Sequence, residues 1–203
     1  MEPPMPKTVD YYFAPQSPWT YLGHQRFTEI SRAAGATVNV LPADFGQVFA
    51  VSGGLPLAQR APQRQAYRLV ELRRFSEALA LPLNLHPKHF PVPGDKAARL
   101  ILAVAAREGS DAAMRLTHAV LRAVWVEERD IGDASTLGAL LGETGLPAER
   151  LAESLTQTVA QRYMQVTRQA IDAGVFGAPT YVVDGELFWG QDRLDFVERA
   201  LTR

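Results

Sequence analysis

The sequence predicts an α/β fold in which a long helical segment interrupts a small β-sheet. Two short strand patterns near the start flank a helical one. The middle of the chain has helical spacing alone, and the chain ends with a hairpin pattern followed by a helix. The predicted order of elements is therefore βαβ, a helical block and ββα.

The first unit is a strand, a helix and a second strand. Residues 8–13 are aromatic and β-branched, which is typical of a buried strand. Residues 18–34 have helix-compatible composition that ends near Gly35, and residues 37–41 form the second strand. A connection of this length between strands is a right-handed crossover, so we expect the two strands to lie parallel.

The middle segment, residues 56–174, is predicted to be helical. Apolar residues recur at helical spacing, for example at Leu116, Val120 and Val124. Asp95 and Ser110 are placed to cap helices, whereas Gly109 and Gly174 suit helix ends. We expect this segment to be an insertion that separates two parts of one sheet domain, residues 1–55 and residues 175–203.

The last segment returns to strand character. Residues 180–183 and 186–189 are strand-like and flank Asp184-Gly185, a pair that favours a hairpin turn. A final helix is expected from about Asp192 to Leu201.

Composition and charge exclude several classes of function. The chain has 203 residues, of which 47% are hydrophobic and 21% charged, as in ordinary globular proteins. A net charge of -1 gives no electrostatic signature for nucleic acid or an anionic membrane, so a small molecule or a protein is the expected partner. Without cysteine, the chain itself has no disulfide, thiolate metal site or redox thiol, and any thiol chemistry must come from a bound cofactor.

The sequence also predicts a soluble, cytoplasmic protein. No apolar run approaches the ~18 residues that span a bilayer. The first seven residues lack the apolar core of a signal peptide.

Two short segments, far apart in the chain, are candidates for one active site. Ser17-Pro18 fits a helix start, with serine as N-cap and proline in the first turn. The same geometry suits catalysis, because a helix N-terminus stabilises an anion and a serine hydroxyl there can donate to a thiolate. Pro179 either begins a strand in the trans form or makes a tight cis turn beside a site, and the sequence leaves the isomer open.

These segments resemble the 2-hydroxychromene-2-carboxylate isomerases. The similar residues are Ser17-Pro18-Trp19 and Tyr21-Leu22-Gly23 at the front and the run from Gly174 to Arg193 at the back. These enzymes are grouped with kappa-class glutathione transferases in the DsbA-like branch of the thioredoxin fold. The resemblance implies a thioredoxin-like α/β fold with a large α-helical insertion, a homodimer, and reduced glutathione as cofactor.

The resemblance also implies roles for individual residues. Ser17 matches the catalytic serine that contacts the glutathione sulfur. Pro179 matches a cis-proline, and the residue before it, Ala178, pairs through its backbone with glutathione. Gln191 and Asp192 match positions that hold the γ-glutamyl end, where a carboxylate can pair with the ammonium group.

Other positions complete or depart from the pattern. Trp189 is expected to form a wall of the site, and Arg64 lies near a position where relatives often carry a basic residue. Where relatives often have an asparagine close to glutathione, this chain has Gly54, which has no side-chain amide. Residues 90–94 also lack a polar group that relatives carry. These departures affect the expected substrate more than the expected cofactor.

Further polar residues have simpler interpretations. His86 and His89 lie three apart, but the loop context and the lack of nearby carboxylates argue against a metal site. His24 and His118 lie on predicted helices and are expected to be solvated or hydrogen-bonded.

The cluster of Arg68, Arg73 and Arg74 most simply forms a solvated helix face. An arginine that lines a cleft could instead hold a substrate carboxylate.

The resemblance implies a glutathione-dependent cis–trans isomerase of aromatic hydrocarbon catabolism. Its substrate would be a small aromatic carboxylate, with interconversion of 2-hydroxychromene-2-carboxylate and trans-o-hydroxybenzylidenepyruvate by reversible thiolate addition. Two alternatives stay open: a kappa-like glutathione transferase that conjugates electrophiles, and a non-catalytic thioredoxin-fold binding module. A dithiol oxidoreductase is excluded by the absence of cysteine.

Overall fold

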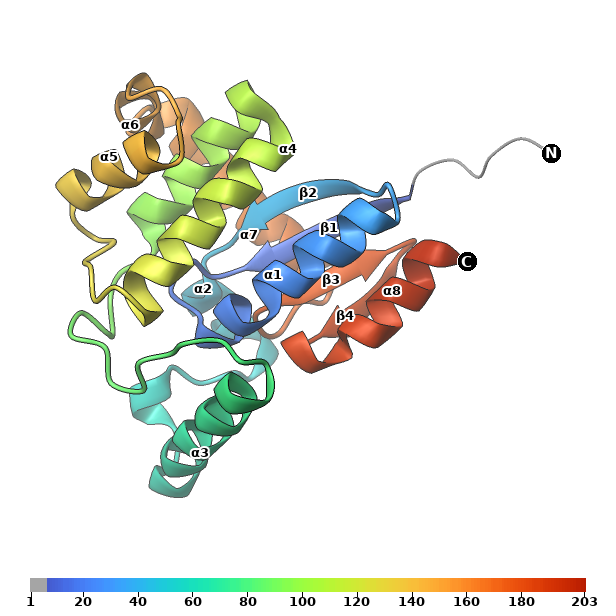
Figure 1. Ribbon diagram of the computed structural model, residues 1–203. Helices are drawn as coiled ribbons and strands as arrows, with labels where there is room; N and C mark the ends of the chain where they lie inside the picture. Colours follow the sequence, from blue (N-terminus) through green and yellow to red (C-terminus); the bar gives the residue numbers. More distant parts are fainter. Residues whose placement is uncertain (1–6) are drawn as a thin grey trace.

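A computed structural model describes residues 7–203 and has one four-stranded sheet at its centre (Figure 1). The strands are β1 (Thr8–Phe13), β2 (Thr37–Pro42), β3 (Thr180–Val183) and β4 (Glu186–Trp189). They lie in the order β2-β1-β3-β4. The β1–β2 pair is parallel, as the strand–helix–strand pattern predicts, whereas β1–β3 and β3–β4 are antiparallel.

The helices surround this sheet and extend well beyond it (Figure 1). They are α1 (Pro18–Ala33), α2 (Phe45–Ser52), α3 (Pro62–Ala78), α4 (Asp95–Trp125), α5 (Ala134–Glu143), α6 (Glu149–Ser154), α7 (Gln157–Asp172) and α8 (Leu194–Thr202). Two short 3-10 helices, η1 (Leu57–Gln59) and η2 (Gln191–Arg193), are also present.

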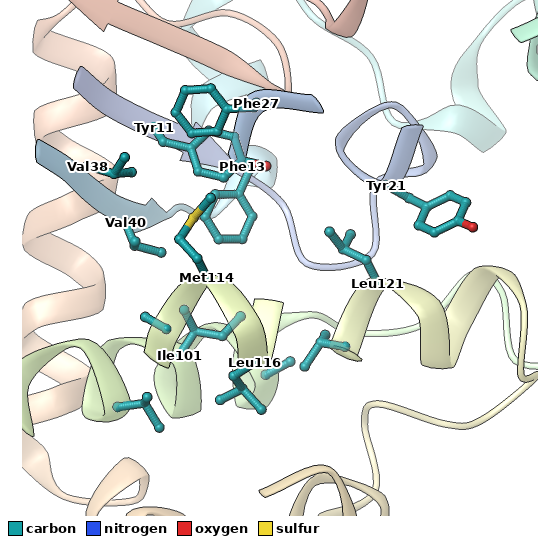
Figure 2. Close-up of a cluster of buried hydrophobic side chains, with 14 of the residues drawn as sticks. Tyr11, Phe13, Tyr21, Phe27, Val38, Val40, Ile101, Met114, Leu116 and Leu121 are labelled. Atoms are coloured by element: carbon teal, nitrogen blue, oxygen red, sulfur yellow. The ribbon is translucent and has the colours of Figure 1, made fainter. Parts of the chain in front are cut away.

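Alternation along β1 divides the core into two layers. Tyr11 and Phe13 point to one face of the sheet and pack with residues of α1, α4 and α8. Figure 2 shows this cluster, in which the rings of Tyr11, Phe13 and Phe27 lie next to Met114. Tyr12, between them in sequence, points to the opposite face and packs with residues of α2 and α7. The central strand is therefore covered on both sides.

The helix α7 belongs to the packing of the sheet, although it lies within residues 56–174. Val166 and Ala170 of α7 form a buried cluster with Tyr12 and Leu41 of the sheet. The division of the chain into residues 1–55, 56–174 and 175–203 stays a prediction. The packing of α7 suggests that the last part of the helical segment covers the sheet instead of standing apart from it.

The caps expected on α4 differ from those in the structure. The N-cap is Gly94, and Asp95 occupies the first turn. The helix is interrupted at Gly109, whose φ of 82° lies in the region that favours glycine. Ser110 does not cap the second half: its Oγ donates instead to the carbonyl oxygen of Val38 in β2, at 2.6 Å. The expectation of a Ser110 cap was wrong because the Ser110 hydroxyl bonds to Val38, which is distant in sequence, and not to the backbone of its own helix.

Within residues 7–203, no helix is long and apolar enough to cross a membrane.

Candidate active site

Most of the candidate residues lie at one end of the sheet. In the antiparallel register, Tyr12 pairs with Thr180, and Thr180 pairs with Trp189. The carboxyl end of β1, the amino end of β3 and the carboxyl end of β4 therefore meet at the same edge. Ser17 follows β1, Pro179 precedes β3 and Gln191 follows β4. The fold thus brings together the segments around Ser17 and Pro179, which lie about 160 residues apart in the chain.

Ser17 is the N-cap of α1, as the serine–proline pair predicts. Its backbone is extended, and its Oγ accepts a hydrogen bond from the Thr20 N–H at 3.2 Å. The hydroxyl proton has no acceptor among residues 7–203, and the N–H of Trp19 is likewise without a partner there. One O–H and one N–H at a positive helix end therefore remain free to donate to an anion.

The peptide bond between Ala178 and Pro179 is cis, which answers the question that the sequence left open. The carbonyl oxygen of Pro179 accepts from the Gly190 N–H at 2.9 Å, so the start of β3 is tied to the end of β4. The N–H and carbonyl of Ala178 form no hydrogen bond within the described part of the chain. A backbone donor and acceptor are thus available for an extended peptide ligand.

Gln191 and Asp192 differ in their surroundings. Gln191 is 5% exposed and packs against Gly23 of α1, where an added Cβ would lie 2.8 Å from the Gln191 Cβ. Asp192 is exposed, and its Oδ2 lies 2.6 Å from Nη1 of Arg193. Gln191 therefore fixes η2 on α1, whereas the Asp192 carboxylate stays accessible to a second cation.

Trp189 and Arg64 lie at different distances from this group. The indole of Trp189 is half exposed, covers Gly177 and packs edge-to-face on Phe176, with ring centroids 4.9 Å apart. It thus lies beside the segment that leads into Ala178. Arg64, on α3, is exposed, and no side-chain hydrogen bond or ion pair within residues 7–203 joins it to the residues at the end of the sheet.

A cavity of about 350 Å³ adjoins this site and was not predicted from the sequence. Gln16, the residue before Ser17, contributes to its wall, together with Asp44, Phe49, Asp95 and Tyr163. The Oε1 atom of Gln16 is buried without a hydrogen-bond partner in the described chain. The Tyr163 phenol, which is protonated at neutral pH and can donate, has its pKa raised further by burial and by the neighbouring Asp44.

The sequence held only weak signals for this cavity. Gln16 lies inside the Ser17 motif, but nothing in its local sequence marks it as a lining residue. Tyr163 lies between the α7 positions Val159 and Val166 at helical spacing, a pattern that indicates packing and gives no sign of a cavity-lining role.

Among residues 7–203, no three His, Asp or Glu side chains gather in a way that could hold a metal ion.

Fold and site define a thioredoxin-fold protein with serine, not cysteine, at the start of the first helix. The family described as the DSBA-like thioredoxin domain matches residues 8–202. A 2-hydroxychromene-2-carboxylate isomerase of Sphingobium xenophagum is 31% identical over 199 residues, which cover 97% of this chain and 99% of the relative. The human glutathione S-transferase kappa 1 is 24% identical, over 98% of this chain and 92% of its own.

Solved structures agree with the sequence relatives. The structure of a 2-hydroxychromene-2-carboxylate isomerase superposes with a TM-score of 0.76 at 27% identity, over 96% of this chain and 94% of the other. The chain therefore belongs to the DsbA-like thioredoxin-domain family and, within it, to the 2-hydroxychromene-2-carboxylate isomerase family of enzymes. The thioredoxin-like fold and the family predicted from the sequence are confirmed.

Proposed function

We propose that this enzyme is a glutathione-dependent cis–trans isomerase that interconverts 2-hydroxychromene-2-carboxylate and trans-o-hydroxybenzylidenepyruvate in aromatic hydrocarbon catabolism. The observation that carries the proposal is the free hydroxyl proton of Ser17 at the N-terminus of α1, in a chain without cysteine. Such a site can stabilise a thiolate but cannot supply one. The family relatives at 31% identity support the choice of substrate.

The residues at the end of the sheet fit glutathione. Ala178 offers a backbone N–H and carbonyl that have no partner among residues 7–203 and suit the peptide backbone of the cofactor. Asp192 offers an exposed carboxylate, which suits the ammonium group of the γ-glutamyl end. When bound, glutathione supplies a thiolate that adds reversibly to the conjugated substrate and so permits rotation about a former double bond.

The chain's own residues prepare this chemistry. The Ser17 hydroxyl donates to the sulfur, and the dipole of α1 favours its negative charge, so the site lowers the thiol pKa. Trp189 and Phe176, which pack on each other, form an apolar wall beside Ala178. Gln191, buried against Gly23, holds the Asp192 loop in place.

A second candidate is a kappa-like glutathione transferase, which the similarity to the human kappa transferase favours. Such an enzyme would use the same residues but release a thioether. Mass analysis of the product separates the two functions, because an isomerase product keeps the mass of its substrate.

The test is to follow the absorbance of 2-hydroxychromene-2-carboxylate with the purified enzyme, with and without reduced glutathione. We expect reduced glutathione to accelerate the isomerisation relative to the reaction without it. S-methylglutathione should bind as glutathione does but give no acceleration, because it cannot form a thiolate. Equal rates in all three reactions would contradict the proposal. The homodimer and the cytoplasmic location stay predictions, and light scattering of the same preparation tests the first.

A further inference from the structure

Arg68 of α3 is a partly buried cation that has no anionic partner in the described part of the chain. Its guanidinium lies over two aromatic rings, with Cζ 5.4 Å from the centroid of Phe90 and 5.8 Å from that of Trp125. No hydrogen bond or ion pair joins the guanidinium to any of residues 7–203. The solvated helix face expected from the sequence describes Arg73 and Arg74, which are exposed, but not Arg68.

A second positive charge, that of Arg60, lies near Arg68. Burial, followed by the charge of Arg60, lowers the pKa of Arg68 to about 10, so it stays charged at neutral pH. Burial and the nearby Arg64 lower the pKa of Arg60 in the same way. The closest carboxylate in sequence, Glu71, pairs with Arg74 instead. A desolvated cation among like charges favours an incoming anion.

The stacking also determines which atoms are free. A guanidinium that rests on an aromatic ring uses its planar face, so the N–H groups at its edge still point outward. The edge matches a carboxylate in geometry, because two parallel N–H donors can meet its two oxygens.

Contacts on both sides of Arg68 connect its region to the segment around Ser17. Phe75, seven residues further along α3, packs edge-on against Trp19, with ring centroids 6.0 Å apart. On the other side, the Arg60 guanidinium lies 6.0 Å from the ring of Phe49, which lines the cavity next to Gln16. Since residues seven apart share one face of a helix, Arg68 faces the same region as Phe75.

We propose that Arg68 binds the carboxylate of the aryl 2-oxo or enol acid substrate and so orients its conjugated chain toward the Ser17 end of the site. This inference rests on the proposed function and identifies the substrate-binding cation within it. The carboxylates of glutathione have the same chemistry, so the experiment must distinguish the two sources.

The test measures binding without turnover. Calorimetric titration compares 2-oxo-4-phenylbutanoate, which lacks the conjugated double bond, with its methyl ester, which lacks the charge. The wild-type enzyme should prefer the acid, and Arg68→Met should lose about tenfold or more in affinity for the acid alone. Methionine keeps apolar contact with the two rings, and Arg68→Lys should fall between, because it keeps the charge without the bidentate edge.

The matched control is Arg73→Met, which removes an exposed arginine from the same helix and should bind the acid as the wild type does. A parallel titration with S-methylglutathione should be unchanged in Arg68→Met. The proposal is overturned if the wild type does not prefer the acid, if Arg68→Met keeps that preference, or if only S-methylglutathione binding weakens. If the preference is lost as expected but glutathione fails to accelerate isomerisation, the carboxylate site stands and the proposed reaction fails.

Discussion

Ser17 caps α1 through its Oγ, and in the proposed function the same oxygen carries the proton that is donated to the thiolate. Its Oγ accepts from the Thr20 N–H and so caps α1, while its proton is free to donate to a bound anion. The two roles are compatible because a hydroxyl can accept and donate at once. They also have different energetic signatures, since a cap affects stability and a donor to a thiolate affects rate.

We expect Ser17→Ala to lower the isomerisation rate at saturating glutathione by about tenfold to a hundredfold, the usual value of a hydrogen bond to a charged group. Glutathione affinity should change less, because the Ala178 backbone and Asp192 are untouched. The pKa of the bound thiol should rise, and ultraviolet absorbance of the thiolate against pH measures this directly.

The control for capping is Thr156→Ala, which removes the N-cap of α7, where the Thr156 Oγ1 accepts from the Val159 N–H. Both variants should lose about 1 kcal/mol of stability, but only Ser17→Ala should lose rate. Equal isomerisation rates in Ser17→Ala and the wild type would contradict the proposed role of Ser17 as a donor to the thiolate.

For single residues, the sequence predicts those whose role depends on positions close to them in the chain. Ser17 and Pro179 could be identified because capping and strand entry depend on the next few positions. The role of Arg68 could not be identified in this way, because its aromatic neighbours Phe90 and Trp125 lie 22 and 57 residues further along the chain. Helical spacing tells which residues share a face but not what covers that face.

Among the elements, the contact between α1 and η2 positions Asp192, the residue proposed to hold the γ-glutamyl end of glutathione. Gly23 permits this contact, because a Cβ there would lie 2.8 Å from the Gln191 Cβ and 3.2 Å from the Tyr181 hydroxyl. Gly23 is thus needed for close approach, in the middle of a helix that would otherwise favour alanine.

We expect Gly23→Ala to displace η2 and weaken glutathione binding several-fold, with about 1–3 kcal/mol lost from stability through overpacking. Gly142→Ala is the matched control, because Gly142 lies in α5, no atom of residues 7–203 lies within 4 Å of the added methyl, and the change should be neutral or slightly stabilising. Calorimetry with S-methylglutathione and thermal unfolding measure the two effects. Unchanged binding in Gly23→Ala would show that η2 does not support the cofactor site.

The elements themselves were predictable where turn chemistry and periodicity agree. The hairpin at Asp184-Gly185 has positive φ at both residues, 51° and 82°, as this dipeptide favours. The short helix η2, by contrast, precedes α8 where the sequence predicts one continuous helix from Asp192. Its start depends on the packing of Gln191 against α1, a tertiary contact without a local signal.

For the whole molecule, a buried histidine joins three elements of the core. His24 of α1 is 2% exposed, and its Nδ1 lies 3.1 Å from the Tyr11 hydroxyl of β1. Its Nε2 lies 3.0 Å from the carbonyl oxygen of Met114 in α4. Because that carbonyl only accepts, Nε2 must carry the proton, and Nδ1 accepts from Tyr11. The neutral ring is therefore the form that the core holds.

This arrangement predicts acid-sensitive stability. Burial lowers the pKa of His24 from 6.5 to about 3, so the unfolded chain binds a proton between these values and the folded chain does not. The contribution of His24 to stability is complete above about pH 6.5 and is lost as the pH falls toward 3. The free energy of unfolding should drop by up to about 1.4 kcal/mol per pH unit within this window.

Urea unfolding at a series of pH values, from neutral to mildly acidic, measures the slope. We expect His24→Gln to be less stable at neutral pH but to have a shallower slope, since it has no proton to gain. His86→Gln, at an exposed position, should keep the wild-type slope. Some slope should remain in His24→Gln, because burial also lowers the pKa of His118, whose ring stacks on His24. If His24→Gln and the wild type lose stability in parallel on acidification, the buried neutral histidine is not the cause.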